Sequence, residues 1–77
     1  MQLSQLKVGH KAIIKGLRAG DKAYRQRLLA MGLLPGTEFT LSRMAPLGDP
    51  VEITVRGYAL SLRKHEAGIL IIEEVSQ

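Results

Sequence analysis

Residues 51–62 carry apolar side chains at every second position in two runs, 51–55 and 58–62, which the pair Arg56-Gly57 separates. Alternation of this kind places all the apolar side chains on one face of a strand. A two-residue loop sets Val55 opposite Tyr58 and keeps both apolar rows on the same face, so the register is satisfied without strain. The sequence therefore predicts a tight antiparallel hairpin, and the rest of the chain must cover its apolar face.

Three further segments have the character of strands. Residues 11–17 are β-branched in the middle and are expected to end near Gly16. Residues 38–44 alternate, but Met44 falls out of phase, which predicts a bulge near Ser42-Arg43. Residues 69–72 are apolar throughout, as expected of a closing strand that is buried on both sides or that joins two sheet edges. Before these strands, a short N-terminal turn is expected to lie over the core with three apolar residues, Leu3, Leu6 and Val8.

One helix is expected after the first strand. Asp21 is placed to cap its first amides, and its charge suits the positive end of the helix dipole. Gly32 stands where a left-handed C-terminal residue is needed, and Leu33 can fold back onto Leu28. The helix must end there because proline in Leu34-Pro35-Gly36 cannot continue it. One face of the helix is formed by apolar residues at helical spacing: Tyr24, Leu28 and Met31.

These elements predict a mainly β fold: a small five-stranded antiparallel barrel with one α-helix inserted after the first strand. Closure of the barrel is expected to remove the exposed sheet edges. A chain of 77 residues suffices for a single domain, residues 1–77, with one mostly aliphatic core and without cysteines to cross-link it. No apolar run approaches the roughly 20 residues that span a bilayer, and the N-terminus lacks a signal-peptide stretch, so a cytosolic location is expected.

Catalytic and metal-binding patterns are scarce in this sequence. His10 and His65 lie at opposite ends of the chain, and neither has a strong second ligand at the spacing of metal sites, apart from Glu66 beside His65. Asp49 with Glu52 would bind a hard cation weakly, or they are plain surface acids. Met31 and Met44 are better explained by core packing than as soft ligands, and the glycines form no phosphate-binding loop. We therefore expect no enzyme activity, no cofactor and no metal-ligand set.

Recognition of another macromolecule is the remaining class of function. The net charge is +4, and residues 7–27 hold seven lysines and arginines against one acid. Such a field steers a domain toward an acidic protein face, nucleic acid or anionic lipid, or it only solvates the surface. The one aromatic residue among these charges, Tyr24, is assigned to the apolar face of the helix, which leaves nucleic-acid binding poorly supported. Arg25 falls inside the apolar sector of the helix, where an arginine either extends along the barrel surface, which is the more common case, or is offered to a partner. Leu47 stands at the tip of a loop with two prolines, where it is either an interface anchor that loses little entropy on docking or a leucine folded back over a barrel end.

Several segments, taken in order, resemble the FeoA family, the small accessory proteins of bacterial ferrous iron transport. Residues 25–36 (RQRLLAMGLLPG) are similar to the family's helix and turn, and residues 45–50 (APLGDP) to its central loop. Residues 55–63 resemble its hairpin and residues 67–75 its last strand. The resemblance implies an SH3-like barrel over the whole chain, and a role beside FeoB, a membrane transporter with a GTP-hydrolysing domain.

The leading hypothesis is a cytosolic regulatory module that binds the FeoB transporter through Arg25, Arg27 and Leu47 and modulates its activity. A narrower variant is a GTPase activator that offers Arg25 or Arg27 to the developing phosphate charge. The alternatives are a ferrous metallochaperone, or a nucleic-acid-binding SH3-like module as in metal-dependent repressors. The oligomeric state stays open, and a homo-oligomer is compatible with the sequence.

Overall fold

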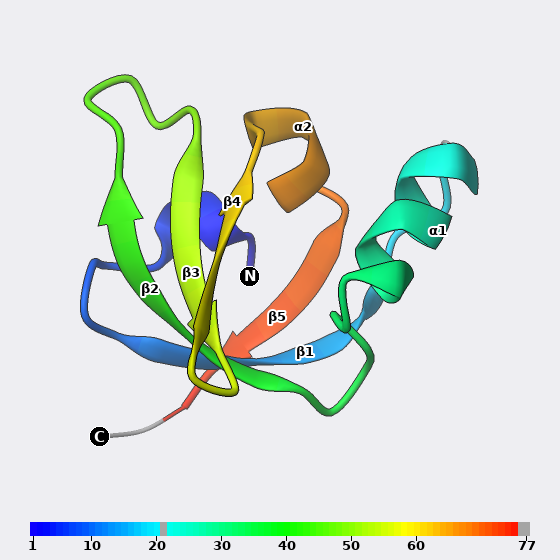
Figure 1. The fold of residues 1–77 in the computed structure, drawn as a ribbon, viewed down its shortest axis with the longest axis horizontal. Helices are drawn as coiled ribbons and strands as arrows, with labels where there is room; N and C mark the ends of the chain where they lie inside the picture. Colours follow the sequence, from blue (N-terminus) through cyan, green and yellow to red (C-terminus); the bar gives the residue numbers. More distant parts are fainter. Residues whose placement is uncertain (21, 76–77) are drawn as a thin grey trace.

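The computed structural model describes residues 1–20 and 22–75, and their strands form one curved antiparallel sheet (Figure 1). Its strand order is β4-β3-β2-β1-β5. The predicted five-stranded fold with a helix after the first strand is confirmed. In chain order the elements are η1 (Leu3–Gln5), β1 (Lys11–Leu17), α1 (Lys22–Ala30), β2 (Glu38–Met44), β3 (Val51–Val55), β4 (Tyr58–Leu62), α2 (Lys64–Ala67) and β5 (Leu70–Glu74).

The predicted hairpin joins β3 to β4, with Val55 paired to Tyr58. Arg56 and Gly57 both have positive φ angles, 50° and 84°, as a type I′ turn requires. The predicted bulge in β2 is also present, because the register against β3 shifts between Leu41 and Arg43. The residues of the turn and the alternation of side chains therefore determine how β2, β3 and β4 pair with one another.

The closing strand differs from its prediction. It begins and ends later than residues 69–72, and Ile71 is 37% exposed, so β5 is not buried on both faces. Within the described residues β5 pairs with β1 alone, and no ladder joins it to β4 at the other end of the sheet. One face of an end strand turns to solvent, which explains the exposure of Ile71, and the expected loss of both sheet edges is incomplete.

Helix α1 ends in a Schellman motif, as Gly32 predicts. The N–H of Leu33 donates to the carbonyl of Leu28 at 3.1 Å, and the N–H of Gly32 donates to that of Leu29 at 3.0 Å. Gly32 has a φ of 90°, which glycine adopts without a steric penalty. The expected cap at the other end, Asp21, lies outside the described residues.

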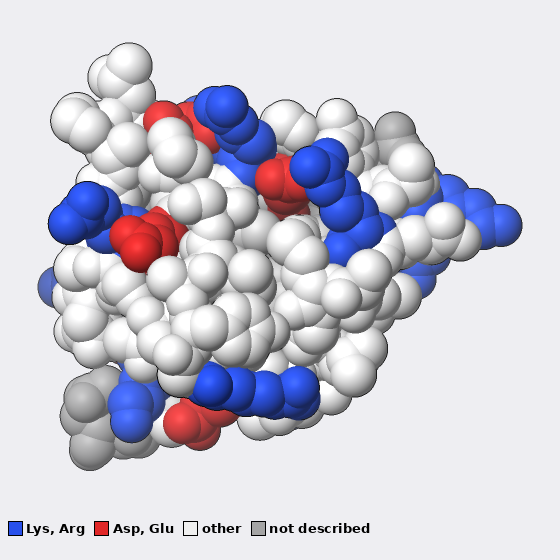
Figure 2. Space-filling view, viewed as in Figure 1, with Lys and Arg blue, Asp and Glu red and all other residues white. Residues whose placement is uncertain are grey.

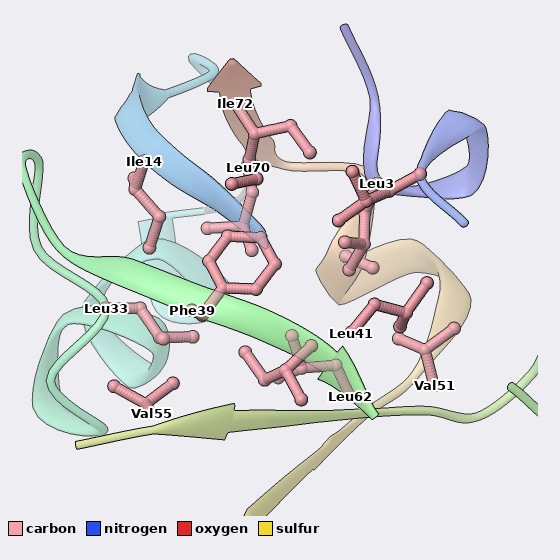
Figure 3. Packing of buried hydrophobic residues seen from close by; sticks show 14 of the residues in the cluster. Leu3, Ile14, Leu33, Phe39, Leu41, Val51, Val55, Leu62, Leu70 and Ile72 are labelled. Carbon is pink, nitrogen blue, oxygen red and sulfur yellow. The ribbon is translucent and has the colours of Figure 1, made fainter. Parts of the chain in front are cut away.

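The core is aliphatic around one phenylalanine. Ile14 of β1 and Leu70 of β5 point toward the ring of Phe39, and Leu33 packs from the turn after α1 (Figure 3). Leu3 of η1 is also fully buried, so the N-terminal turn covers the core as expected. Val8 does not take part: it is 56% exposed, because it lies in the turn that leads away from the core toward β1.

Candidate functional site

Leu47 lies at the tip of the loop between β2 and β3, and its side chain is 90% exposed. The loop is closed by its own backbone. The N–H of Gly48 donates to the carbonyl of Ala45 at 2.7 Å, and the N–H of Ala45 donates to the carbonyl of Pro50 at 3.1 Å. An apolar side chain with so much exposure contributes little to folding, and the loop that carries it is held in one shape.

The same loop is attached to α2 by a side chain. The Oδ1 atom of Asp49 accepts the backbone N–H of Lys64, the first residue of α2, at 3.1 Å. The first amides of a helix have no partner within the helix, so an acceptor from the loop fixes where α2 begins. Asp49, which the sequence offered as a weak cation ligand, thus has a structural role.

Glu66 attaches α2 on its other side. Its side chain is nearly buried, its Oε1 atom accepts the backbone N–H of Arg63 at 2.9 Å, and its Oε2 atom lies 3.7 Å from Nη1 of Arg27 in α1. The sequence interpretation named Glu66 only as a neighbour of His65 and did not predict this role. The available signal was its place three positions after the N-cap residue Arg63, where capping boxes carry glutamate or glutamine.

The loop 45–50, α2 and α1 follow one another along one side of the molecule, at the top of Figure 1; we call this surface the rim. Arg25 and Arg27 lie together in α1, and α2 separates them from Leu47. The side chain of Arg27 is largely exposed, whereas Arg25 is half-buried and its Nε atom is shielded without a hydrogen-bond partner among the described residues. Figure 2 shows basic and acidic side chains next to one another along the rim.

A groove of about 420 Å³ opens beside the rim, between η1, the loop 45–50 and α2. Its lining is predominantly apolar and includes the half-buried Met44. Of the described residues that line it, Lys64 is the one that carries a charge. Residues from three separate parts of the chain form its walls: Leu3 and Ser4, Leu47 and Gly48, and Lys64 and Ala67.

At the end of the sheet formed by β1 and β5, basic residues of the first strand lie beside acidic residues of the last. Because β5 runs antiparallel to β1, its acids face the bases of the first strand. Nδ1 of His10 lies 2.5 Å from Oε2 of Glu74, and Nζ of Lys15 lies 3.8 Å from Oε1 of Glu73. The basic character predicted for residues 7–27 is therefore partly compensated at β1, but it persists along α1.

The two histidines are placed apart, as expected. His10 pairs with Glu74, while the ring of His65 contacts that of Tyr24 edge to face, with centroids 4.8 Å apart. Met31 and Met44 pack against the core, which confirms the packing interpretation. Across residues 1–20 and 22–75, no three histidine, aspartate or glutamate side chains gather in a way that would hold a metal ion. None of the described helices is long and apolar enough to cross a membrane.

A family model described as the FeoA domain matches residues 1–74. A fusion of Fe(2+) transport protein A with the Fe(2+) transporter FeoB, from Porphyromonas gingivalis, is 37% identical over 76 residues. That match covers 99% of this chain and 9% of the fusion protein, so the chain spans a small part of this relative.

Solved structures give the same correspondence. A FeoA-like protein from Clostridium acetobutylicum superposes with a TM-score of 0.87 at 32% identity, covering 100% of this chain and 88% of that one. FeoA from Stenotrophomonas maltophilia, solved with zinc, has a TM-score of 0.81 at 25% identity and covers 95% and 89% of the two chains. It is described as a procaryotic SH3 domain protein and as a candidate activating factor for ferrous iron transport.

Proposed function

This chain belongs to the FeoA family, the accessory proteins of ferrous iron transport, and we propose that it works by binding a FeoB-type transporter at its cytosolic face and modulating its activity. The family is non-catalytic and its fold is SH3-like. In this proposal residues 1–77 form one FeoA-type domain that acts in the cytosol, and its effect is exerted through contact alone.

The observation that carries the proposal is the fused relative, in which a segment similar to this chain is joined to FeoB. Linking two proteins in one polypeptide turns their association into an intramolecular event with a high effective concentration. Fusion is advantageous when the two parts work in contact. A separate chain of the same family would make the same contact as a bimolecular complex.

The rim supplies the chemistry that such contact needs. Leu47 is an exposed apolar side chain on a loop that its own hydrogen bonds close. Its docking would therefore restrict few additional rotatable bonds and lose little conformational entropy. Arg27 presents its guanidinium to solvent at the other end of the rim. Arg25, two residues earlier in α1, is half-buried and leaves the helix on a different face. Arginine is among the residue types that carry most of the binding energy at protein interfaces, and an exposed leucine adds apolar area that is buried on contact.

The test is a titration of this protein against the purified cytosolic region of the FeoB-type transporter, with and without guanine nucleotide. We expect saturable binding that Leu47→Asp, Arg25→Glu and Arg27→Glu each weaken, together with a change in the transporter's GTP hydrolysis on binding. Lys15→Glu is the matched control, because it reverses a charge of the same size on β1, away from the rim. Absence of binding would refute the proposal, and equal binding by all variants would remove the rim from it.

A further inference from the structure

We propose that the groove between η1, the loop 45–50 and α2 receives a segment of the partner in which an apolar side chain stands next to a carboxylate. The proposal rests on the proposed function and specifies which surface makes the contact and what chemistry it accepts. Three features carry it: the shape of the groove, its single charge and the exposure of Leu47 at its mouth.

The groove has the size and lining of a binding site for an apolar side chain. Its volume is about 420 Å³, within the range in which protein pockets bury small ligands or anchor residues. Met44 in its wall is flexible and polarisable, and such a residue adapts to an incoming side chain. Within residues 1–20 and 22–75 no aromatic ring lines the wall, so this part of the chain does not supply the surface on which proline-rich segments dock in other SH3-like domains.

The walls of the groove are fixed before any partner arrives. Asp49 joins the loop to the first amide of α2 at 3.1 Å, and the loop is closed by its backbone hydrogen bonds. Leu3, on the η1 side, is fully buried in the core. A preformed site binds without the entropic cost of ordering its walls.

Lys64 determines the charge of the occupant. It is the one charged residue that lines the groove, and among the described residues its ammonium takes part in no ion pair. The nearby carboxylate of Asp49 accepts the backbone N–H of Lys64 and leaves the ammonium available. A carboxylate at the mouth of the groove would pair with this exposed lysine, and the pair would select the sign of charge that the occupant carries.

Charge also favours an acidic partner over a second copy of this chain. The protein carries a net charge of +4, so two copies repel each other. The acids nearest to the C-terminus, Glu73 and Glu74, are already occupied by Lys15 and His10 of the same chain. Leu47, at the mouth of the groove, would pack against whatever apolar group precedes or follows the inserted side chain.

The first experiment uses a minimal probe, sodium octanoate, and octylammonium chloride as the control with the same tail and the opposite charge. We expect octanoate to shift the NMR amide signals of Gly48, Ala67 and Gly68, and to leave that of Gly57, in the β3–β4 turn, in place. Octylammonium should give much smaller shifts, and Lys64→Glu should reverse the preference. Equal shifts by both probes, or shifts spread over the whole protein, would overturn the proposal.

The second experiment uses the cytosolic region of the transporter and a variant that fills the groove. Ser4 is exposed and lines the groove, so Ser4→Trp should obstruct it without disturbing the core. We expect Ser4→Trp and Lys64→Glu to weaken binding about tenfold or more, the size expected on loss of a central anchor. Lys64→Arg should bind nearly as the wild type. Ala59→Trp, at an exposed position of β4 outside the groove, is the matched control, and thermal melts verify that each variant is folded.

The outcomes separate this inference from the proposed function. If the wild type binds the transporter and Ser4→Trp binds equally well, the groove is wrong and the proposed function stands. If the wild type does not bind, the proposed function fails and the octanoate experiment decides the groove alone. Sedimentation of the isolated protein tests the remaining occupant: a dimer that Ser4→Trp dissociates would show that a second copy fills the groove, and would overturn the proposal.

Discussion

The carboxylate of Glu66 lies between two elements: its Oε2 atom is 3.7 Å from Nη1 of Arg27 in α1, and its Oε1 atom accepts the N–H of Arg63 at 2.9 Å. Glu66 is only 6% exposed, so it has little water to replace either partner. A charge in such a place is stable only when protein groups solvate it. Glu66 therefore fixes the start of α2 together with Asp49, and it also joins α2 to α1 through Arg27.

We predict that Glu66→Ala lowers the free energy of unfolding by about 1–2 kcal/mol, because the Arg63 amide loses its acceptor and a small cavity remains. Glu66→Gln should cost clearly less, since an amide oxygen can accept the same N–H. Urea denaturation followed by circular dichroism measures both changes. Equal stability of the two variants would show that the charge, and not the capping hydrogen bond, carries the effect.

A second prediction concerns the end of α1. Gly32→Ala should lower the free energy of unfolding by about 1–2 kcal/mol, because φ is positive there, and its Cβ would lie 3.2 Å from the Tyr58 hydroxyl. Gly36→Ala is the matched control: its φ is 91°, but a Cβ there meets nothing within 4 Å. The difference between the losses of unfolding free energy in Gly32→Ala and Gly36→Ala measures the steric contact between the new Cβ and the Tyr58 hydroxyl. Tyr58→Phe removes this contact together with the hydrogen bond that the Tyr58 hydroxyl donates to the carbonyl of Met31 at 3.0 Å, so Gly32→Ala should cost less in the Tyr58→Phe background than in the wild type.

What the sequence predicted well depends on local rules. The Arg56-Gly57 turn needs two residues that accept positive φ, the Schellman motif needs Gly32, and the bulge in β2 follows from the phase of Met44. Each of these is decided within a few residues of the chain. Backbone sterics and side-chain alternation act at that range, so the pattern alone is sufficient.

What the sequence did not predict depends on contacts between distant segments. The exposure of Ile71 follows from the position of β5 at the end of the sheet, and the burial of Glu66 follows from the approach of α1. The groove is lined by residues from η1, the loop 45–50 and α2, which are far apart in the chain. The sequence left Leu47 either as an exposed anchor or as a leucine folded back over a barrel end, and both its exposure and its place beside a groove required the fold.

A third prediction separates folding from recognition at Leu47. Leu47→Ala should change the free energy of unfolding by no more than about 0.5 kcal/mol, because its side chain is almost fully exposed. Leu41→Ala removes the same atoms from a fully buried site and should cost about 2–5 kcal/mol. The same Leu47→Ala protein should bind the transporter's cytosolic region more weakly than the wild type. Unchanged binding by this stable variant would exclude Leu47 from the interface.

The last prediction concerns the charge of the rim and separates Arg27 from the lysines of β1. The side chain of Arg27 is 68% exposed, and Glu66 keeps its hydrogen bond to the Arg63 amide without it, so Arg27→Gln should stay folded. If the rim meets an acidic surface, raising the salt from about 0.1 M to about 1 M shortens the Debye length from about 10 Å to about 3 Å and slows association. Stopped-flow measurement should show a shallower salt dependence of the association rate for Arg27→Gln, and an unchanged one for Lys15→Gln, whose side chain faces Glu73 on the other edge of the sheet. Equal salt dependence in both variants would mean that the partner senses the net charge of the protein, and that the rim does not direct the approach.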